Sequence, residues 1–118
     1  MKRILLVEDN EDNLFLFRTL LGLGNYELFE ATTGIKGVAV ANSEKPDLII
    51  MDIQLPDING LEVTRQIRSS LGHAPIIIAV TSYAMLGDCD MCIEAGCNGY
   101  IEKPINPEKF LQEIESYF

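Results

Sequence analysis

Residues 48–51 read Leu48-Ile49-Ile50-Met51, a continuous apolar run that ends directly at an acid, Asp52. An apolar run without polar alternation is typical of a strand that is covered on both faces of a parallel sheet. Four further apolar runs occur along the chain, at residues 4–7, 26–31, 76–80 and 99–101, and most of them are equally continuous. The sequence therefore predicts five strands in a parallel sheet.

Segments with helical periodicity separate these runs. One apolar stripe lies before Gly22 and Gly24, which mark the end of a helix, and consists of Leu16, Phe17, Leu20 and Leu21. A second stripe follows Asn106 as N-cap and Pro107 at the first helical position, and consists of Phe110, Ile114 and Tyr117. Strand and helix alternate five times, which predicts right-handed crossovers and a doubly wound α/β domain with helices on both faces.

The composition is that of one globular domain over residues 1–118, with 47% hydrophobic and 23% charged residues and a formal net charge of −9. Because nucleic acid and anionic membranes are also negatively charged, we do not expect so acidic a chain to bind them directly. Its apolar runs fall far short of the roughly 20 residues that span a bilayer, and residues 1–3 lead directly into a predicted strand, so we expect no signal peptide. Three clustered cysteines, Cys89, Cys92 and Cys97, form no complete disulfide framework, so we expect reduced thiols in the cytoplasm.

Polar residues follow four of the predicted strands at the point where each strand ends. They are Glu8-Asp9-Asn10, Asp52, Thr81-Ser82 and Glu102-Lys103-Pro104. Because the carboxyl ends of parallel strands meet at one edge, we expect three acids to converge there with a hydroxyl and an amine. Each residue alone has an ordinary explanation as a helix cap or a solvated side chain. Crowded carboxylates, however, raise one another's pKa and destabilise a fold, and a bound divalent cation resolves that conflict.

A ligand set made only of oxygen atoms favours Mg²⁺, and Mg²⁺ is typical of phosphate chemistry. A carboxylate such as Asp52 can attack phosphorus to form an aspartyl phosphate. Lys103 then supplies a fixed cation, and Thr81 donates a hydrogen bond to a phosphoryl oxygen. The sequence has no P-loop motif and no complete G-x-G-x-x-G motif, so we do not expect a nucleotide as the phosphoryl donor.

Over essentially its whole length the chain resembles the receiver domain of two-component response regulators, in the CheY-like superfamily. The matching pieces are residues 4–10, residues 51–56 with Gly60, residues 79–82 and residues 99–104. Within the family it is most similar to the single-domain DivK-like regulators, and because it runs from the first strand to the last helix we expect no output domain. The resemblance implies a flavodoxin-like (βα)5 sandwich with strand order 2-1-3-4-5.

The resemblance also implies a reaction. Asp52 would accept a phosphoryl group from a phosphohistidine of a histidine kinase or phosphotransfer protein, so the domain would catalyse only its own phosphorylation and dephosphorylation. Asp9 and Asp52 would ligate Mg²⁺ directly, the Gln54 backbone carbonyl would add a third protein oxygen, and Glu8 would act through water. Many members carry two aspartates where this chain has Glu8-Asp9, and the longer glutamate side chain should still reach a metal-bound water.

Family resemblance further implies how phosphorylation is reported. The Thr81 hydroxyl would move toward the new phosphoryl group, and the Tyr100 ring would turn from solvent to the interior, a local charge change that biases a bistable packing element. A downstream protein would bind through Tyr100 and the last helix, and the domain would be a monomer or a weak phosphorylation-dependent dimer. The Lys103-Pro104 peptide bond is expected to be cis, which directs the lysine toward the acids.

Three other readings compete with a receiver domain. A Mg²⁺-dependent phosphatase of the haloacid-dehalogenase type needs a second acid two residues after the nucleophile, where this chain has Gln54, and an amide cannot shuttle protons. A flavodoxin-like cofactor carrier needs a neutral phosphate loop where this chain is acidic. A zinc site at Cys89 and Cys92 has no second pair of ligands.

Two residues of the first predicted helix fall outside its apolar stripe. Stepping 100° per residue places Phe15 nearly opposite the stripe and Leu14 on its flank, so we expect both to be partly exposed. Pro104 and Ile105 lie on the same rim of the site. We therefore predict that Leu14, Phe15, Pro104 and Ile105 form the docking surface for the histidine-bearing partner, since its histidine must come close to Asp52.

Overall fold

The structure is a computed structural model that describes residues 1–82 and 88–118. Its strands are Lys2–Val7 (β1), Tyr26–Ala31 (β2), Leu48–Asp52 (β3), Ile76–Thr81 (β4) and Gly99–Glu102 (β5). Its helices are Glu11–Leu21 (α1), Gly34–Glu44 (α2), Gly60–Leu71 (α3), Asp88–Ala95 (α4) and Pro107–Glu115 (α5). The five predicted strands are confirmed, and several extend one or two residues beyond the apolar run that predicted them.

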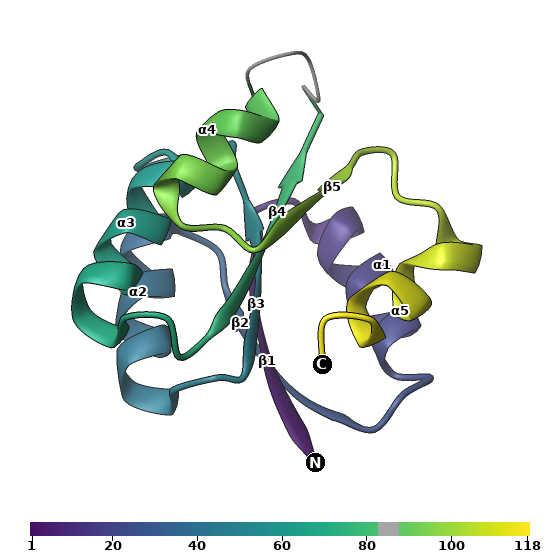
Figure 1. Ribbon diagram of the computed structural model, residues 1–118. Coiled ribbons are helices and arrows are strands. Elements are labelled where there is room, and N and C mark those ends of the chain that lie inside the picture. The colour runs from purple at the N-terminus through teal and green to yellow at the C-terminus, as the bar shows by residue number, and fades with distance from the viewer. Residues whose placement is uncertain (83–87) are drawn as a thin grey trace.

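The strands form one parallel sheet in the order β2-β1-β3-β4-β5, as the resemblance implies. Helices α1 and α5 cover one face of this sheet, and α2, α3 and α4 cover the other (Figure 1). Every residue of β3 is buried, which explains why its sequence shows no polar alternation. On the α1 and α5 side, Phe17 stacks on Phe110 with the ring centroids 5.3 Å apart.

Register places the polar strand ends at one edge of the sheet. Val7 pairs with Met51 between β1 and β3, and Asp52 pairs with Val80 between β3 and β4. Thr81 in turn pairs with Glu102 on β5. Residues that directly follow β1, β4 and β5 therefore lie beside Asp52, where the sequence predicted a site.

The predicted helix boundaries at both ends of the chain are confirmed. Gly22 is the C-cap of α1, and its backbone N–H donates to the carbonyl oxygens of Arg18 and Leu20. Asn106 is the N-cap of α5, with Pro107 in the first turn. The fold thus follows local signals where the chain enters and leaves these helices.

The predicted face of α1 is partly wrong. Leu14 is buried, with 1% of its surface exposed, whereas Leu16 is only half-buried; Phe15, at 66% exposed, is on the outside as predicted. The buried arc is centred between Phe17 and Leu21, and Leu14 lies at i−3 and i−7 from these two residues, which puts it within the arc. Ile105 is also buried, because it packs with the hydrophobic cluster beneath α1 and α5.

Cys92 and Cys97 are both buried and pack in the hydrophobic cluster on the α2, α3 and α4 side of the sheet. The side chain of Cys89 lies outside the described residues, so the zinc alternative at Cys89 and Cys92 stays untested. Among the described residues, the one acidic or thiol cluster with metal-like spacing is Glu8, Asp9 and Asp52. No helix within the described part of the chain is long and apolar enough to cross a membrane.

Candidate functional site

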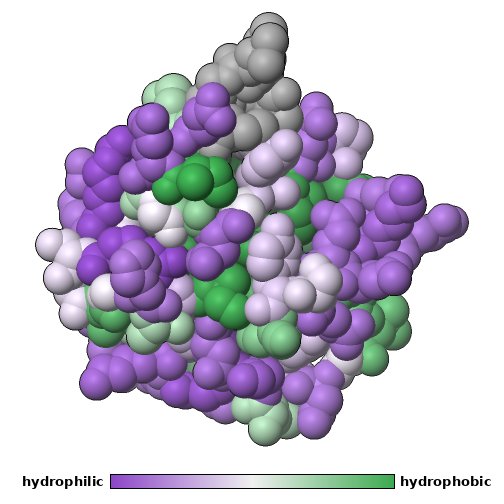
Figure 2. Space-filling model, viewed as in Figure 1, coloured by the Kyte–Doolittle hydropathy of each residue, from purple (hydrophilic) through white to green (hydrophobic). Residues whose placement is uncertain are grey.

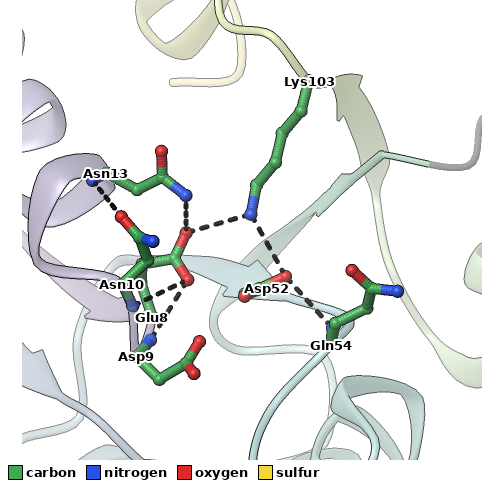
Figure 3. A network of polar contacts seen from close by, with 7 residues as sticks. All are labelled: Glu8, Asp9, Asn10, Asn13, Asp52, Gln54 and Lys103. Carbon is green, nitrogen blue, oxygen red and sulfur yellow. Dashed lines mark hydrogen bonds and ion pairs between the residues drawn. The ribbon is translucent and has the colours of Figure 1, made fainter.

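Three acids and one lysine meet at the carboxyl edge of the sheet (Figure 3). Glu8 and Asp9 follow β1, Asp52 ends β3, and Lys103 follows β5. One carboxylate oxygen from each of the three acids lies within 4.8 Å of the others. The structure therefore brings together the acids and the amine that the sequence predicted at this edge.

Glu8 is the most enclosed of the three acids, with only 1% of its surface exposed. Its Oε2 accepts hydrogen bonds from the backbone N–H groups of Asp9 and Asn10, at 3.1 and 3.4 Å. Its Oε1 accepts from the Asn13 side-chain amide at 3.0 Å and from Lys103 Nζ at 3.1 Å. A buried carboxylate needs such donors, because burial otherwise opposes its charge.

Lys103 lies between the two buried acids. Its Nζ is 3.1 Å from Glu8 Oε1 and 3.5 Å from Asp52 Oδ1. The Lys103-Pro104 peptide bond is cis, as predicted. The Lys103 backbone N–H also donates to the Thr81 carbonyl oxygen at 2.8 Å, which ties this segment to the end of β4.

The segment after Asp52 is held closely against the end of β3. The Gln54 backbone N–H donates to Asp52 Oδ1 at 3.0 Å, and the Gly60 N–H donates to the Ile53 carbonyl oxygen at 2.9 Å. A Cβ atom on Gly60 would lie 2.2 Å from the Asp52 carbonyl oxygen, so only glycine allows α3 to start here. The same segment carries Asp57, whose carboxylate accepts from the first backbone N–H groups of α2, those of Gly34 and Ile35.

The two buried acids differ in how readily they ionise. Burial, together with the hydrogen bond and the negative charge of Glu8, raises the pKa of Asp52 to about 7, against the smaller opposing effects of Gln54 and Lys103. Burial also opposes ionisation of Glu8, but its hydrogen bonds and the charge of Lys103 outweigh burial, so the Glu8 pKa is lowered. One lysine therefore does not neutralise the cluster, and the all-oxygen donor set fits a hard divalent cation.

The remaining predicted residues lie around this cluster. Thr81 is buried at the end of β4, and Tyr100 on β5 is 42% exposed. A groove of about 470 Å³ runs beside Lys103, and its lining consists of Asn13, Leu16, Ser82, Lys103, Pro104 and Ile105. Phe15 and Pro104 are exposed, whereas Leu14 and Ile105 are not, so only part of the predicted docking set is open to a partner.

Sequence reasoning missed two residues of the site. Asn13 was not singled out, although it is the third helical residue after the N-cap Asn10, the position from which a capping-box side chain reaches back toward the start of a helix. Asp57 was missed because its partners lie at residues 34 and 35, far away in the sequence.

Comparison with known proteins yields one consistent family. A family model described as the response regulator receiver domain matches residues 4–115. The polar-differentiation response regulator DivK of Brucella anthropi is 44% identical over 118 residues, covering 98% of this chain and 95% of that protein.

Solved structures agree. A CheY-like response regulator receiver domain protein from Methanospirillum hungatei JF-1 has a TM-score of 0.91 and 33% identity, covering 99% of this chain and 93% of that chain. The receiver domain of a sensor histidine kinase from Pseudomonas aeruginosa PAO1, with a magnesium ion coordinated in its active site cleft, has a TM-score of 0.88 and 34% identity. That likeness covers 98% of this chain and 96% of the Pseudomonas chain.

Proposed function

The chain belongs to the response regulator receiver domain family of two-component signalling, and from this premise we propose that Asp52 is its phosphoacceptor. The observation that carries the proposal is the placement of the Asp52 carboxylate, which ends β3 within reach of Lys103 and beside Glu8 and Asp9. We also propose that residues 1–118 act as one phosphoacceptor domain in the cytoplasm. Receiver domains are signalling proteins rather than classical enzymes.

The proposed reaction is phosphoryl transfer from a phosphohistidine. A carboxylate oxygen of Asp52 attacks phosphorus, the P–N bond breaks, and its electron pair stays on the imidazole nitrogen, which then takes up a proton. Lys103 Nζ, 3.5 Å from Asp52 Oδ1, neutralises charge on the phosphoryl oxygens, and the Thr81 hydroxyl donates to one of them. The product is a phosphorylated state of the chain itself. Later attack by water on phosphorus breaks its bond to the Asp52 oxygen, releases inorganic phosphate and restores the carboxylate.

Asp9, Asp52 and the Gln54 backbone carbonyl would hold Mg²⁺, with Glu8 acting through a water molecule. When bound, Mg²⁺ neutralises charge on the acids and on the phosphoryl oxygens. The donor set supports this role, because it consists of oxygen atoms and carries more negative charge than Lys103 offsets. The haloacid-dehalogenase alternative gains no support, since Gln54 offers no second acid to protonate a leaving group.

Thr81 and Tyr100 are the proposed switch residues. Thr81 lies on β4 and Tyr100 on the neighbouring strand β5, where Ala79 is its partner. A downstream protein would read the position of the Tyr100 ring together with α5. Figure 2 shows hydrophilic residues with hydrophobic patches between them on the face that carries α4, β5 and α5. Met91 and Ile93 on α4 are exposed hydrophobic residues, as is Tyr100 itself.

The histidine-bearing partner would dock on the α1 side of the site. Phe15 and Pro104 are the exposed members of the predicted docking set, and the groove lined in part by Leu16 lies next to Lys103. We therefore propose a docking surface of Phe15, Leu16 and Pro104, with Leu14 and Ile105 supporting it from beneath. A helical phosphotransfer domain could rest there with its histidine near Asp52.

Labelling with acetyl phosphate tests the phosphoacceptor. We expect Mg²⁺-dependent addition of one phosphoryl group to the wild type and none to Asp52→Asn, measured by intact-protein mass spectrometry. The amide keeps the shape of Asp52 but is not a nucleophile. Equal labelling of Asp52→Asn, or rapid turnover of a phosphate ester, would overturn the proposal.

Docking is tested by comparing two phosphoryl donors. Phe15→Ser should keep phosphorylation by acetyl phosphate and lose most phosphorylation by a cognate histidine donor. Leu23→Ser is the matched control, because Leu23 is also exposed and lies beyond the opposite end of α1. Retention of both reactions by Phe15→Ser would show that the donor docks elsewhere.

A further inference from the structure

Asn13 connects the first turn of α1 to the acid cluster. Its side-chain amide donates to Glu8 Oε1 at 3.0 Å, the same oxygen that Lys103 Nζ approaches at 3.1 Å (Figure 3). The backbone N–H of Asn13 donates to Asn10 Oδ1 at 3.0 Å, so the residue is fixed in place by the N-cap of its own helix. Asn13 is therefore a rigidly placed neutral donor beside a buried charge.

The two oxygen atoms of Glu8 are held in different ways. Backbone N–H groups hold Oε2, and their positions change little as long as α1 is formed. Oε1 is held by Asn13 and by Lys103, whose flexible side chain also lies 3.5 Å from Asp52. Any turn of Lys103 toward a group on Asp52 removes one of the two donors from Oε1.

We infer that Asn13 is a positioning residue that keeps Glu8 in place while Lys103 turns toward the phosphoryl group on Asp52. This inference rests on the proposed function of Asp52. If Lys103 were the only side-chain donor to Glu8 Oε1, its departure would leave a buried carboxylate oxygen unsatisfied. Glu8 would then move, or its attraction would keep Lys103 from turning toward Asp52. With Asn13 present, Oε1 keeps a donor throughout, so Lys103 is released and Glu8 stays where it can hold a metal-bound water.

An amide suits this position for a physical reason. It donates without adding charge, so it does not compete with Lys103 or a divalent cation for the acids. An aspartate at residue 13 would add a fourth acid to the cluster of Glu8, Asp9 and Asp52. An alanine would remove the amide donor, so that Lys103 alone would remain of the two side chains that donate to Glu8 Oε1. A glutamine keeps the amide on a longer side chain that can still reach Oε1.

The experiment compares Asn13→Ala, Asn13→Gln and Asn42→Ala. Asn42→Ala is the matched control, because Asn42 is another half-buried helical asparagine, whose amide donates to the Val38 carbonyl oxygen at 2.9 Å on α2, away from the acids. Two quantities are measured, with circular dichroism confirming that each variant is folded: the rate of phosphorylation by acetyl phosphate, and the Mg²⁺ affinity of the unphosphorylated protein by calorimetry.

We expect Asn13→Ala to lower both the rate and the Mg²⁺ affinity about tenfold, the usual effect of removing a residue that orients a ligand. Asn13→Gln should recover a large part of both, and Asn42→Ala should leave both unchanged. Wild-type values for Asn13→Ala overturn the inference, as does an equal loss in Asn42→Ala or no recovery in Asn13→Gln. If Asp52→Asn is still labelled, the proposed function fails instead, whatever Asn13 does.

Discussion

At the scale of the single residue, the reaction requires Asp52 to be ionised, whereas its surroundings favour the protonated acid. Its carboxylate must be ionised to attack phosphorus, but burial and the neighbouring Glu8 raise its pKa to about 7. The folded protein thus holds a proton on this acid, or shares it with Glu8, at pH values where the unfolded chain has released it. Burial of Asp52 beside Glu8 therefore opposes the ionised form that attacks phosphorus and also costs stability at neutral pH.

This conflict predicts a stabilising substitution with a defined pH dependence. Below the ordinary value of 3.8 both states are protonated and Asp52 contributes nothing. As the pH rises toward 7, ionisation favours the unfolded state, and the penalty is complete above that pH. Without Mg²⁺, Asp52→Asn should therefore have a free energy of unfolding that is higher by about 4 kcal/mol at pH 8, and this gain should become small near pH 4.

Urea unfolding from pH 4 to pH 8 measures this difference. Asp12→Asn is the matched control, because it removes the same charge from an exposed site in the first turn of α1. An equal gain in that control would mean that net charge, rather than the buried site, is responsible.

Gly60 sets the geometry of the same site in another way. A Cβ atom at this position would lie 2.2 Å from the Asp52 carbonyl oxygen and 2.8 Å from Ile53 Cα. Since both contacts involve backbone, the start of α3 must move, and we expect Gly60→Ala to destabilise the fold by about 2 to 4 kcal/mol. Thermal unfolding measures it, and Gly22→Ala, whose closest contact would be 3.0 Å, should cost clearly less.

Among the helices, α3 carries Arg68, which lies far from Asp52 and whose hydrogen bonds to the loops before β4 and β5 we call the Arg68 latch. The Arg68 guanidinium donates to the carbonyl oxygens of Gly96, Gly72 and Pro75 at 2.9, 2.9 and 2.6 Å. It also donates to Asn98 Oδ1 at 2.8 Å, an atom that in turn accepts from the Ile77 N–H at the start of β4. One side chain thus joins the end of α3 to the connections that lead into β4 and β5.

Loss of this latch should be costly. We expect Arg68→Ala to lower the free energy of unfolding by about 2 to 3 kcal/mol, because the partly buried carbonyl oxygens of Gly96 and Pro75 lose a charged donor. Arg68→Lys should recover little, since an ammonium cannot reproduce the planar fork. Arg65→Ala, an exposed position on the same helix, is the control for denaturant unfolding, and a similar loss there would argue against the latch.

Elements differ in how far the sequence predicts them. The strands and their order follow from continuous apolar runs and family motifs, and the site acids follow from their positions at the strand ends. The buried face of α1 was misjudged at Leu14, because four apolar residues in a row allow more than one centre for the stripe. Arg68 and Asp57 bond residues brought close only by folding, and a lone arginine or aspartate does not indicate its partner.

In the whole molecule, the acid cluster and the arginine contacts lie at opposite ends of one sheet. Two hydrophobic clusters lie on the two faces of the sheet, and the acids lie at the carboxyl edge above both of them. The latch of Arg68 and the contacts of Arg3 with Asp47 and Glu44 lie toward the other end of the strands. A charge added or neutralised at the acid edge therefore changes the free energy of unfolding of the whole domain, although neither hydrophobic cluster changes its packing.

Mg²⁺ should stabilise the whole molecule through this edge. If the ion binds the folded acids and not the unfolded chain, a Mg²⁺ concentration ten times the dissociation constant adds about 1.4 kcal/mol. For a domain of this size that raises the melting temperature by about 5 °C. Sodium chloride at matched ionic strength screens exposed charge but does not fill the site, so it should give a much smaller rise.

Two variants make this thermal shift specific. Asp9→Ala removes the exposed member of the acid cluster and should abolish most of the Mg²⁺-dependent rise, whereas Asp12→Ala removes a nearby exposed charge outside the cluster and should keep it. A chelator should return the wild type to its original melting temperature. An equal rise in sodium chloride, or a full Mg²⁺ response in Asp9→Ala, would show that the acids are stabilised by general screening rather than by one bound ion.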